Sequence, residues 1–287
     1  MKIKKIIAFL LAAALIAGGT ILLVKRPDIR YRAVSAVHDM VVQRRNPEKA
    51  EIATKRVGID DIEKYGAERN DCLMLVNGSH LLSEHYEPEL STYHDVLFET
   101  NTAEAYPRLA NEVEQRFGEK LYVSSTYRTA EEQWEIYDEQ GGDTAQIPGA
   151  SEHQTGLAVD VYVPYYSGDS FIKCRAGRWV DDNCQDYGFI VRYPAGASRI
   201  TGISYEPWHL RYVGLPHSEI IAENRLTLEE YADFLGEGYV QYDGYYVSHQ
   251  PAGDEIDLPA SFAECTVSPD GEGGWFVTAV GNYCSPN

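Results

Sequence analysis

The five cysteines of this 287-residue chain include no Cys-x-x-Cys pair, and the chain has no internal repeat and no long low-complexity tract. The first absence argues against a structural zinc site built on thiolates. Basic residues are scarce after residue 50, where 15 Lys and Arg stand against 41 Asp and Glu. Because so acidic a body repels phosphate backbones, we predict that nucleic acid is not a partner.

The overall composition is that of a globular protein. Apolar residues make up 44% of the chain and charged residues 24%, which excludes a wholly disordered or fibrous protein. The length suits one main domain with appendages.

One long uncharged run lies near the N-terminus. Ile6 to Val24 are 19 residues without a charge, bounded by lysines and Arg26. This length matches the core of a bilayer, so we predict that residues 1–26 form an uncleaved signal anchor. A cleaved signal is the alternative, because Ala12 to Gly19 is rich in small residues. Basic residues lie on both sides of the run, so they do not decide its orientation in the membrane. The acidity and the cysteines of the remaining chain favour a single-pass cell membrane protein whose main domain is extracytoplasmic.

The cysteines suggest disulfides. Cys174 and Cys184 would close one short loop and Cys265 and Cys284 another, as suits an oxidising compartment, while Cys72 is left over. Five buried thiols in a cytosolic protein are the alternative.

The sequence predicts four segments. After the anchor we expect a helical juxtamembrane stalk over residues 27–70, a main domain over 71–236 and a β-rich extension over 237–287. Helices and short strands alternate within the main domain, which predicts an α+β fold: a small mixed or antiparallel sheet with flanking helices. The predicted helices are 102–117, 129–140, 179–187 and 227–235, and the predicted strands are 72–76, 120–124, 157–163, 189–193, 208–213, a hairpin over 239–247 and 275–279.

The strongest local signal joins two stretches, residues 148–160 and 206–211. They contain His153, Asp160 and His209, which are the nitrogen and oxygen donors that catalytic Zn²⁺ sites use. Gly156 lets the chain double back, so that His153 and Asp160 can face one point. Glu206 precedes His209 by three residues and needs a bend at Pro207 to share the site; there it would act as general base. Taken singly, each of these residues has an ordinary structural explanation.

Together they resemble a known family. Ser151-x-His153-x-x-Gly156-x-Ala158-x-Asp160, followed by Glu206-Pro-Trp-His209, is similar to the zinc D,D-carboxypeptidases of the VanY type, which are relatives of the VanX dipeptidases and of the peptidoglycan L,D-carboxypeptidases. The resemblance covers roughly residues 72–216. It also includes Leu75-Val-Asn77 with Tyr86-x-Pro88, Ser125-x-Tyr127-Arg128-Thr129 with Gln133, and Tyr187-Gly-Phe-Ile190 with Arg192-Tyr-Pro194.

The resemblance implies roles for further residues. His153, Asp160 and His209 would be the zinc ligands and Glu206 the base. Arg128 would stabilise the oxyanion. Substrate would be bound by Ser151, Gln133 and Tyr127, although Ser151 could equally brace its loop as a helix cap.

These residues predict a zinc-dependent carboxypeptidase that removes the terminal D-Ala from peptidoglycan stem peptides ending in D-Ala-D-Ala. L,D-carboxypeptidase action on tetrapeptide stems is the close alternative, because both reactions use the same ligands. A catalytically silent, zinc-containing wall-binding module is the alternative from another class. We expect a monomer whose partners are stem peptides and, through its N-terminal helix, the membrane.

Overall fold

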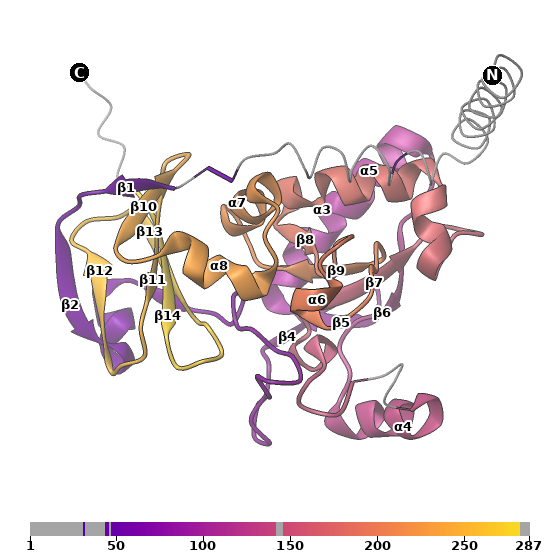
Figure 1. Ribbon diagram of the computed structural model, residues 1–287, viewed down its shortest axis with the longest axis horizontal. Coiled ribbons are helices and arrows are strands. Elements are labelled where there is room, and N and C mark those ends of the chain that lie inside the picture. The colour runs from indigo at the N-terminus through magenta and orange to yellow at the C-terminus, as the bar shows by residue number, and fades with distance from the viewer. Residues whose placement is uncertain (1–30, 32–43, 46, 142–145, 282–287) are drawn as a thin grey trace, which may run out of the picture.

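The computed structural model describes residues 31, 44–45, 47–141 and 146–281. Two groups of strands lie side by side, with helix α8 (Leu228–Leu235) beside both (Figure 1). The predicted anchor over residues 1–26 falls outside the described residues. Within the described part of the chain, no helix combines the length and the apolar character needed to cross a membrane.

The main domain is built on an antiparallel sheet of four strands in the order β6-β7-β9-β8. Its strands are β6 (Tyr122–Ser125), β7 (Ala158–Tyr162), β9 (His209–Tyr212) and β8 (Phe189–Val191). Helices flank this sheet, so the predicted α+β fold is confirmed (Figure 1). The remaining elements of the domain are β4 (Leu90–Tyr93), β5 (Val96–Glu99), α3 (Thr100–Phe117), α4 (Ala130–Gln140), η2 (Glu152–Thr155), η3 (Gly168–Lys173), α5 (Arg175–Asn183), η4 (Cys184–Tyr187), α6 (Ser198–Thr201) and α7 (His217–Asn224).

Helix α3 anchors the core of this domain. Its apolar residues recur every three or four positions, and Ala105, Leu109 and Val113 are completely buried against the sheet. Gly118 ends the helix in the left-handed conformation. Thr102, where the predicted helix 102–117 begins, lies inside the helix, which starts at Thr100. Glu99 is the cap, because its carboxylate accepts a hydrogen bond from the Thr102 amide.

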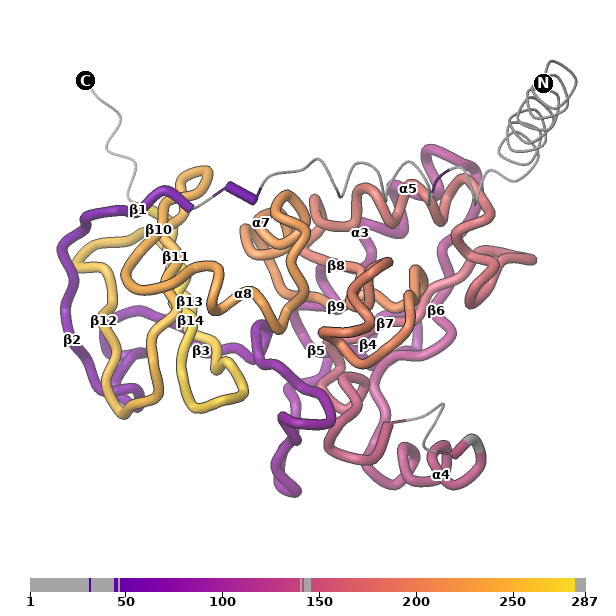
Figure 2. The backbone as a smooth tube through the Cα atoms, viewed as in Figure 1, coloured from indigo at the N-terminus to yellow at the C-terminus, as the bar shows by residue number. Residues whose placement is uncertain are grey.

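The second group of strands, here called the β module, combines both ends of the described chain. A six-stranded sheet has the order β1-β10-β11-β14-β13-β3, and β2 pairs with β12. The indigo and yellow segments of Figure 2 therefore run side by side. The module consists of β1 (Glu48–Ala50), β2 (Thr54–Gly58), η1 (Ile59–Tyr65), β3 (Glu68–Arg69), β10 (Tyr239–Tyr242), β11 (Tyr245–Gln250), β12 (Glu255–Pro259), β13 (Glu264–Pro269) and β14 (Trp275–Val280).

The structure differs here from the expected stalk over 27–70. Residues 48–69 pair with the C-terminal strands, because Val57 and Ile62 bury their side chains in the same core as Ile256 and Val277. The expected hairpin over 239–247 is present, with Tyr242 opposite Tyr245.

The strand predicted over residues 72–76 is wrong, because Cys72 and Leu73 form a turn and residues 74–76 are irregular. Their backbone groups bond to side chains and to the β module instead of a neighbouring strand. Arg211 donates to the carbonyls of Cys72 and Met74, and the Leu73 amide donates to the Ser268 hydroxyl. The Leu75 amide donates to the carbonyl of Asp270, at the turn between β13 and β14. This segment therefore joins the β module to the main sheet.

The predicted disulfide between Cys174 and Cys184 is also wrong. Both residues are buried free thiols. Cys174 caps α5, its sulfur accepting a hydrogen bond from the Gly177 amide, and burial raises the pKa of both thiols. The other predicted pair includes Cys284, which lies outside the described residues, and Cys265 is buried in the core of the β module.

His217 sits at the contact between the main domain and the β module. It is buried, and its two ring nitrogens lie 2.7 Å from the hydroxyls of Tyr231 and Thr278. Neutral imidazole has one donor and one acceptor nitrogen, so it can satisfy both hydroxyls. Burial lowers the pKa of His217 to about 3.

This buried histidine predicts acid sensitivity. Below its unfolded pKa of about 6.5, the unfolded chain takes up a proton at His217 that the folded chain does not, so stability falls as the pH falls. Between about pH 7.5 and 4.5 the wild type should lose about 2–3 kcal/mol more free energy of unfolding than His217→Gln, as measured by urea titration. Equal losses in the two proteins would contradict this assignment.

Candidate metal centre

Two of the predicted ligands lie opposite each other on neighbouring strands of the sheet. Asp160 on β7 is directly opposite His209 on β9 in the antiparallel register. Opposite side chains on one face of such a pair are only about 5 Å apart at Cβ. Asp160 Oδ1 accordingly lies 2.9 Å from His209 Nδ1.

The third predicted ligand, His153, comes from the short helix η2 just before β7. Gly156 ends η2 with a φ of +71°, and a Cβ there would lie 2.6 Å from the Glu99 amide nitrogen. Only glycine fits this reversal, which brings His153 Nε2 to 3.4 Å from Asp160 Oδ2. The other ring nitrogen of His153 is 2.7 Å from the carbonyl oxygen of Thr126, which fixes the ring.

The three side chains fit a zinc ion. One ligand atom from each of His153, Asp160 and His209 can be chosen so that all lie within 4.8 Å of one another. Tetrahedral zinc bonds of about 2.0–2.2 Å place the ligand atoms of one ion about 3.5 Å apart, so the side chains need to approach one another by little more than about 1 Å. Both histidines are buried and Asp160 is partly buried. Two nitrogens and one oxygen leave a fourth position open, as catalytic zinc sites require.

Glu206 lies in the turn before β9. Its carbonyl accepts a hydrogen bond from the His209 amide, and this turn replaces the extended backbone that would have pointed the two side chains apart. The bend expected at Pro207 is therefore present. Burial raises the pKa of the Glu206 carboxyl; the charge of His209 opposes this effect and that of Asp160 adds to it. The carboxyl is thus within electrostatic reach of two of the ligands.

Arg128 approaches the site from the segment between β6 and α4. Its backbone amide donates to the carbonyl of His153, which ties the two residues together. Its Nε is buried without a hydrogen-bond partner among the described residues. Burial lowers the pKa of the guanidinium, and the charge of Asp160 partly restores it. An unpaired cation next to the ligands is suited to an anionic substrate group.

Comparison with known proteins identifies the family. Residues 95–215 match the family described as VanY, D-alanyl-D-alanine carboxypeptidase. The chain is 37% identical over 188 residues to the bifunctional D-Ala-D-Ala dipeptidase and D-Ala-D-Ala carboxypeptidase VanXYC of Enterococcus gallinarum, and the match covers 59% of this chain and 98% of that protein. The chain belongs to the VanY family.

Two further proteins are similar to this VanY-family chain. A D-alanyl-D-alanine carboxypeptidase of Enterococcus faecium is 37% identical over 166 residues, which are 57% of this chain and 50% of that longer protein. The crystal structure of a mutant of the D,D-pentapeptidase VanY from a VanB-type resistance cassette, in complex with Zn(II), matches with a TM-score of 0.50 and 33% identity over 56% of this chain and 98% of that one. Zinc is the cofactor that suits the donor set found here.

The predicted substrate-binding residues of this VanY-family chain lie in different environments. Ser151 is buried just before η2, and its hydroxyl makes no capping bond to that helix. Gln133 is buried on α4, where its Nε2 donates to the carbonyl of Gln146 at 2.7 Å and its Oε1 has no partner among the described residues. Tyr127, next to Arg128, is partly buried.

A buried ionic network beneath the ligands was missed by the sequence analysis. Arg192 Nε donates to Glu152 Oε1 at 2.6 Å, and Arg211 Nη1 lies 2.9 Å from the same oxygen. All three side chains are fully buried. Burial opposes ionisation of Glu152, but the two guanidinium groups outweigh it and hold its pKa well below the usual range. The available signal was an arginine directly after an apolar residue in each of two predicted strands, Arg192 in 189–193 and Arg211 in 208–213.

Proposed function

We propose that this protein is a zinc-dependent D,D-carboxypeptidase that hydrolyses the terminal D-Ala of peptidoglycan stem peptides ending in D-Ala-D-Ala. The observation that carries the proposal is the convergence of His153, Asp160 and His209 on one point, with an open ligand position. The names of the VanY-family relatives support the substrate class.

Each residue has a distinct role in the proposed reaction. Zinc, when bound, supplies Lewis-acid chemistry that polarises a carbonyl and makes water easier to deprotonate. Glu206 takes the proton from the attacking water and delivers it to the leaving amine. A carboxyl group suits both steps, because the carboxylate accepts the proton and the carboxylic acid can then return it.

Arg128 acts where negative charge develops. The hydrogen bond from its backbone amide to His153 places Arg128 beside the ligands, and its Nε has no hydrogen-bond partner among the described residues, so the guanidinium can receive the oxygen of the scissile carbonyl as that oxygen becomes anionic. A fixed donor of this kind contributes about 3–4 kcal/mol to the transition state. Ser151, Gln133 and Tyr127 bind the peptide beside it.

Product analysis tests this proposal. The purified zinc-loaded protein is incubated with a muramyl pentapeptide and, separately, with the tetrapeptide, each with and without a chelator, and the products are identified by mass spectrometry. Chelator-sensitive loss of one alanine from the pentapeptide alone is expected. Loss from the tetrapeptide alone would assign the protein to L,D-carboxypeptidases. No product from either peptide would favour a silent wall-binding module.

The cellular location is a second part of the proposal. We propose that residues 6–24 anchor the chain in the cell membrane and hold the β module and main domain outside. The uncharged length of this run and the acidity of the remaining chain support it. Protease added to intact protoplasts should digest the main domain, and the remaining fragment should stay with the membrane. Protection of the whole chain would contradict the proposed orientation.

A further inference from the structure

The two histidines of the metal centre are held in different ways at the ring nitrogen that faces away from the metal. His153 presents Nε2 to Asp160, and its Nδ1 lies against the Thr126 carbonyl at 2.7 Å. His209 presents Nδ1 to Asp160 at 2.9 Å, so its Nε2 faces away. That Nε2 is buried with no hydrogen-bond partner among the described residues.

The polar atom opposite His209 Nε2 belongs to Glu152. Glu152 Oε2 lies 3.7 Å from this nitrogen and is itself buried without a hydrogen-bond partner in the described part of the chain. Two buried polar atoms without partners thus face each other. Since a buried polar group without a hydrogen-bond partner is destabilising, a pair of this kind calls for an explanation.

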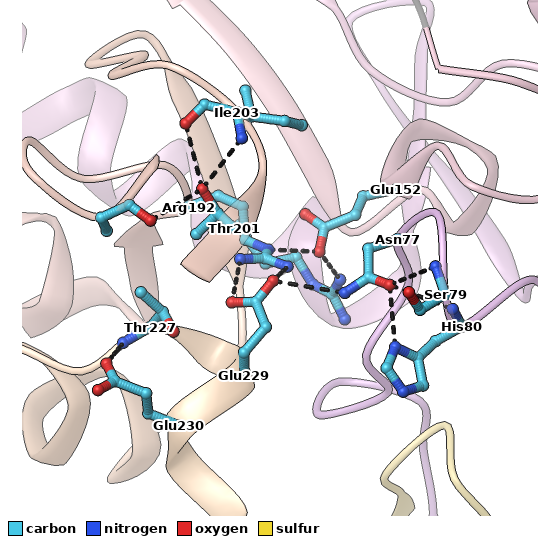
Figure 3. Close-up of polar contacts among 12 residues, drawn as sticks. Asn77, Ser79, His80, Glu152, Arg192, Thr201, Ile203, Thr227, Glu229 and Glu230 are labelled. Carbon is cyan, nitrogen blue, oxygen red and sulfur yellow. Dashed lines mark hydrogen bonds and ion pairs between the residues drawn. The ribbon is translucent and has the colours of Figure 1, made fainter. Parts of the chain in front are cut away.

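The other oxygen of Glu152 fixes where the carboxylate lies. Oε1 accepts the hydrogen bond from Arg192 Nε and lies 2.9 Å from Arg211 Nη1. Arg211 is in turn fixed, because its Nη2 donates to the carbonyls of Cys72 and Met74. Figure 3 shows Arg192 between Glu152 and Glu229. These bonds restrict rotation of the Glu152 carboxylate and keep its Oε2 directed at His209.

The tautomer of His209 explains why a carboxylate lies opposite its Nε2. When Nδ1 of an imidazole is a metal ligand, the remaining ring proton is on Nε2, which then needs an acceptor. An ionised carboxylate in that place orients the ring and increases the basicity of the ligand nitrogen. Resting on the zinc site of the proposed function, we propose that Glu152 is a positioning residue that accepts a hydrogen bond from the Nε2–H group of His209 and strengthens zinc binding.

The chain offers a matched control in Glu229. This residue, on α8, accepts hydrogen bonds from Nη1 and Nη2 of Arg192 at 2.9 and 2.7 Å, on the far side of the guanidinium from Glu152. Among the described residues, its side chain bonds to Arg192 and Asn77 and to none of the three metal ligands. Glu229→Gln therefore removes a buried carboxylate from Arg192 and leaves His209 Nε2 and Glu152 in place.

Zinc affinity measured without substrate tests the proposal. Competition with a chromophoric chelator should show zinc binding weakened about 10–100-fold in Glu152→Gln and by no more than about threefold in Glu229→Gln. A purely structural ion pair would lower the melting temperature of both zinc-free variants and leave both affinities alike, which would overturn the inference. Absence of zinc binding by the wild type would overturn the proposed function as well.

A measurement on the wild type covers the case in which Glu152→Gln does not fold. In the zinc-loaded protein, ¹⁵N-edited NMR of the histidine rings should show a slowly exchanging Nε2 proton on His209, shifted downfield by its carboxylate partner. Correlations within each ring identify the resonance, because His209 would carry its proton on Nε2, whereas His153 would carry its proton on Nδ1. A rapidly exchanging Nε2 proton, or zinc bound at Nε2, would overturn the inference without affecting the zinc assignment.

Discussion

Replacing Glu206 by glutamine should lower kcat for the pentapeptide by about 10³-fold, within the range that general acid–base catalysis contributes. Glutamine keeps the size of the side chain but can neither take the proton from water nor return it to the amine. The zinc content should remain that of the wild type, because Glu206 is outside the three-residue ligand set. Steady-state kinetics and metal analysis of the same sample measure both quantities.

Asp169 provides the control for this change. It is an exposed carboxylate whose charge raises the pKa of Glu206, so it lies within electrostatic reach of the same site. Asp169→Asn makes the same chemical substitution without removing the proposed base, and kcat should stay within a few fold of the wild type. A Glu206→Gln variant with a near-normal rate would refute the mechanism even if the ligand set is right.

Replacing His153 by alanine should abolish zinc binding and activity together. Only three protein ligands are available among the described residues, and a lost ligand should weaken binding by more than the 10–100-fold typical of a residue that merely supports one. Added zinc should not restore the rate, whereas wild-type protein stripped by a chelator should recover when zinc is returned. Metal analysis after dialysis, with the rate measured on the same sample, checks this.

His85→Ala is the matched substitution away from the site. His85 is exposed and lies outside the group of residues able to hold a metal. Its loss should leave both zinc content and rate unchanged. Retention of wild-type zinc by His153→Ala would show that other residues bind the ion.

Sequence reasoning located the metal centre because its chemistry is local. His153, Gly156 and Asp160 are contained in one turn and strand, and the strand's apolar neighbours identified β7. The start of the predicted helix 129–140 was also right, because Thr129 caps α4 and forms a capping box with Glu132. The position of Glu206 near the ligands could be predicted because the proline that follows it indicated a bend in the chain.

What the sequence did not reveal depends on contacts between distant segments. Residues 72–76 are apolar enough for a strand, yet Arg211 and Ser268 take their backbone hydrogen bonds. Cys174 and Cys184 have a spacing compatible with a disulfide, but the sulfur of Cys174 serves as a helix cap. Glu152 was an unassigned position between two motif residues, and its two arginine partners lie 40 or more residues further along the chain. No local pattern encodes these pairings.

The composition of the β module from both ends of the chain has a consequence for biosynthesis. Strand β3 ends at Arg69 and β10 begins at Tyr239, so the first strands leave the ribosome long before their partners exist. At typical rates of synthesis this interval is on the order of 10–30 s. During it the main domain can fold while the edges of β1, β2 and β3 remain unpaired, and such edges readily join other chains. In a chain truncated after Gly236, these strand edges would stay exposed permanently. The last strands therefore protect the chain from aggregation as well as completing the fold.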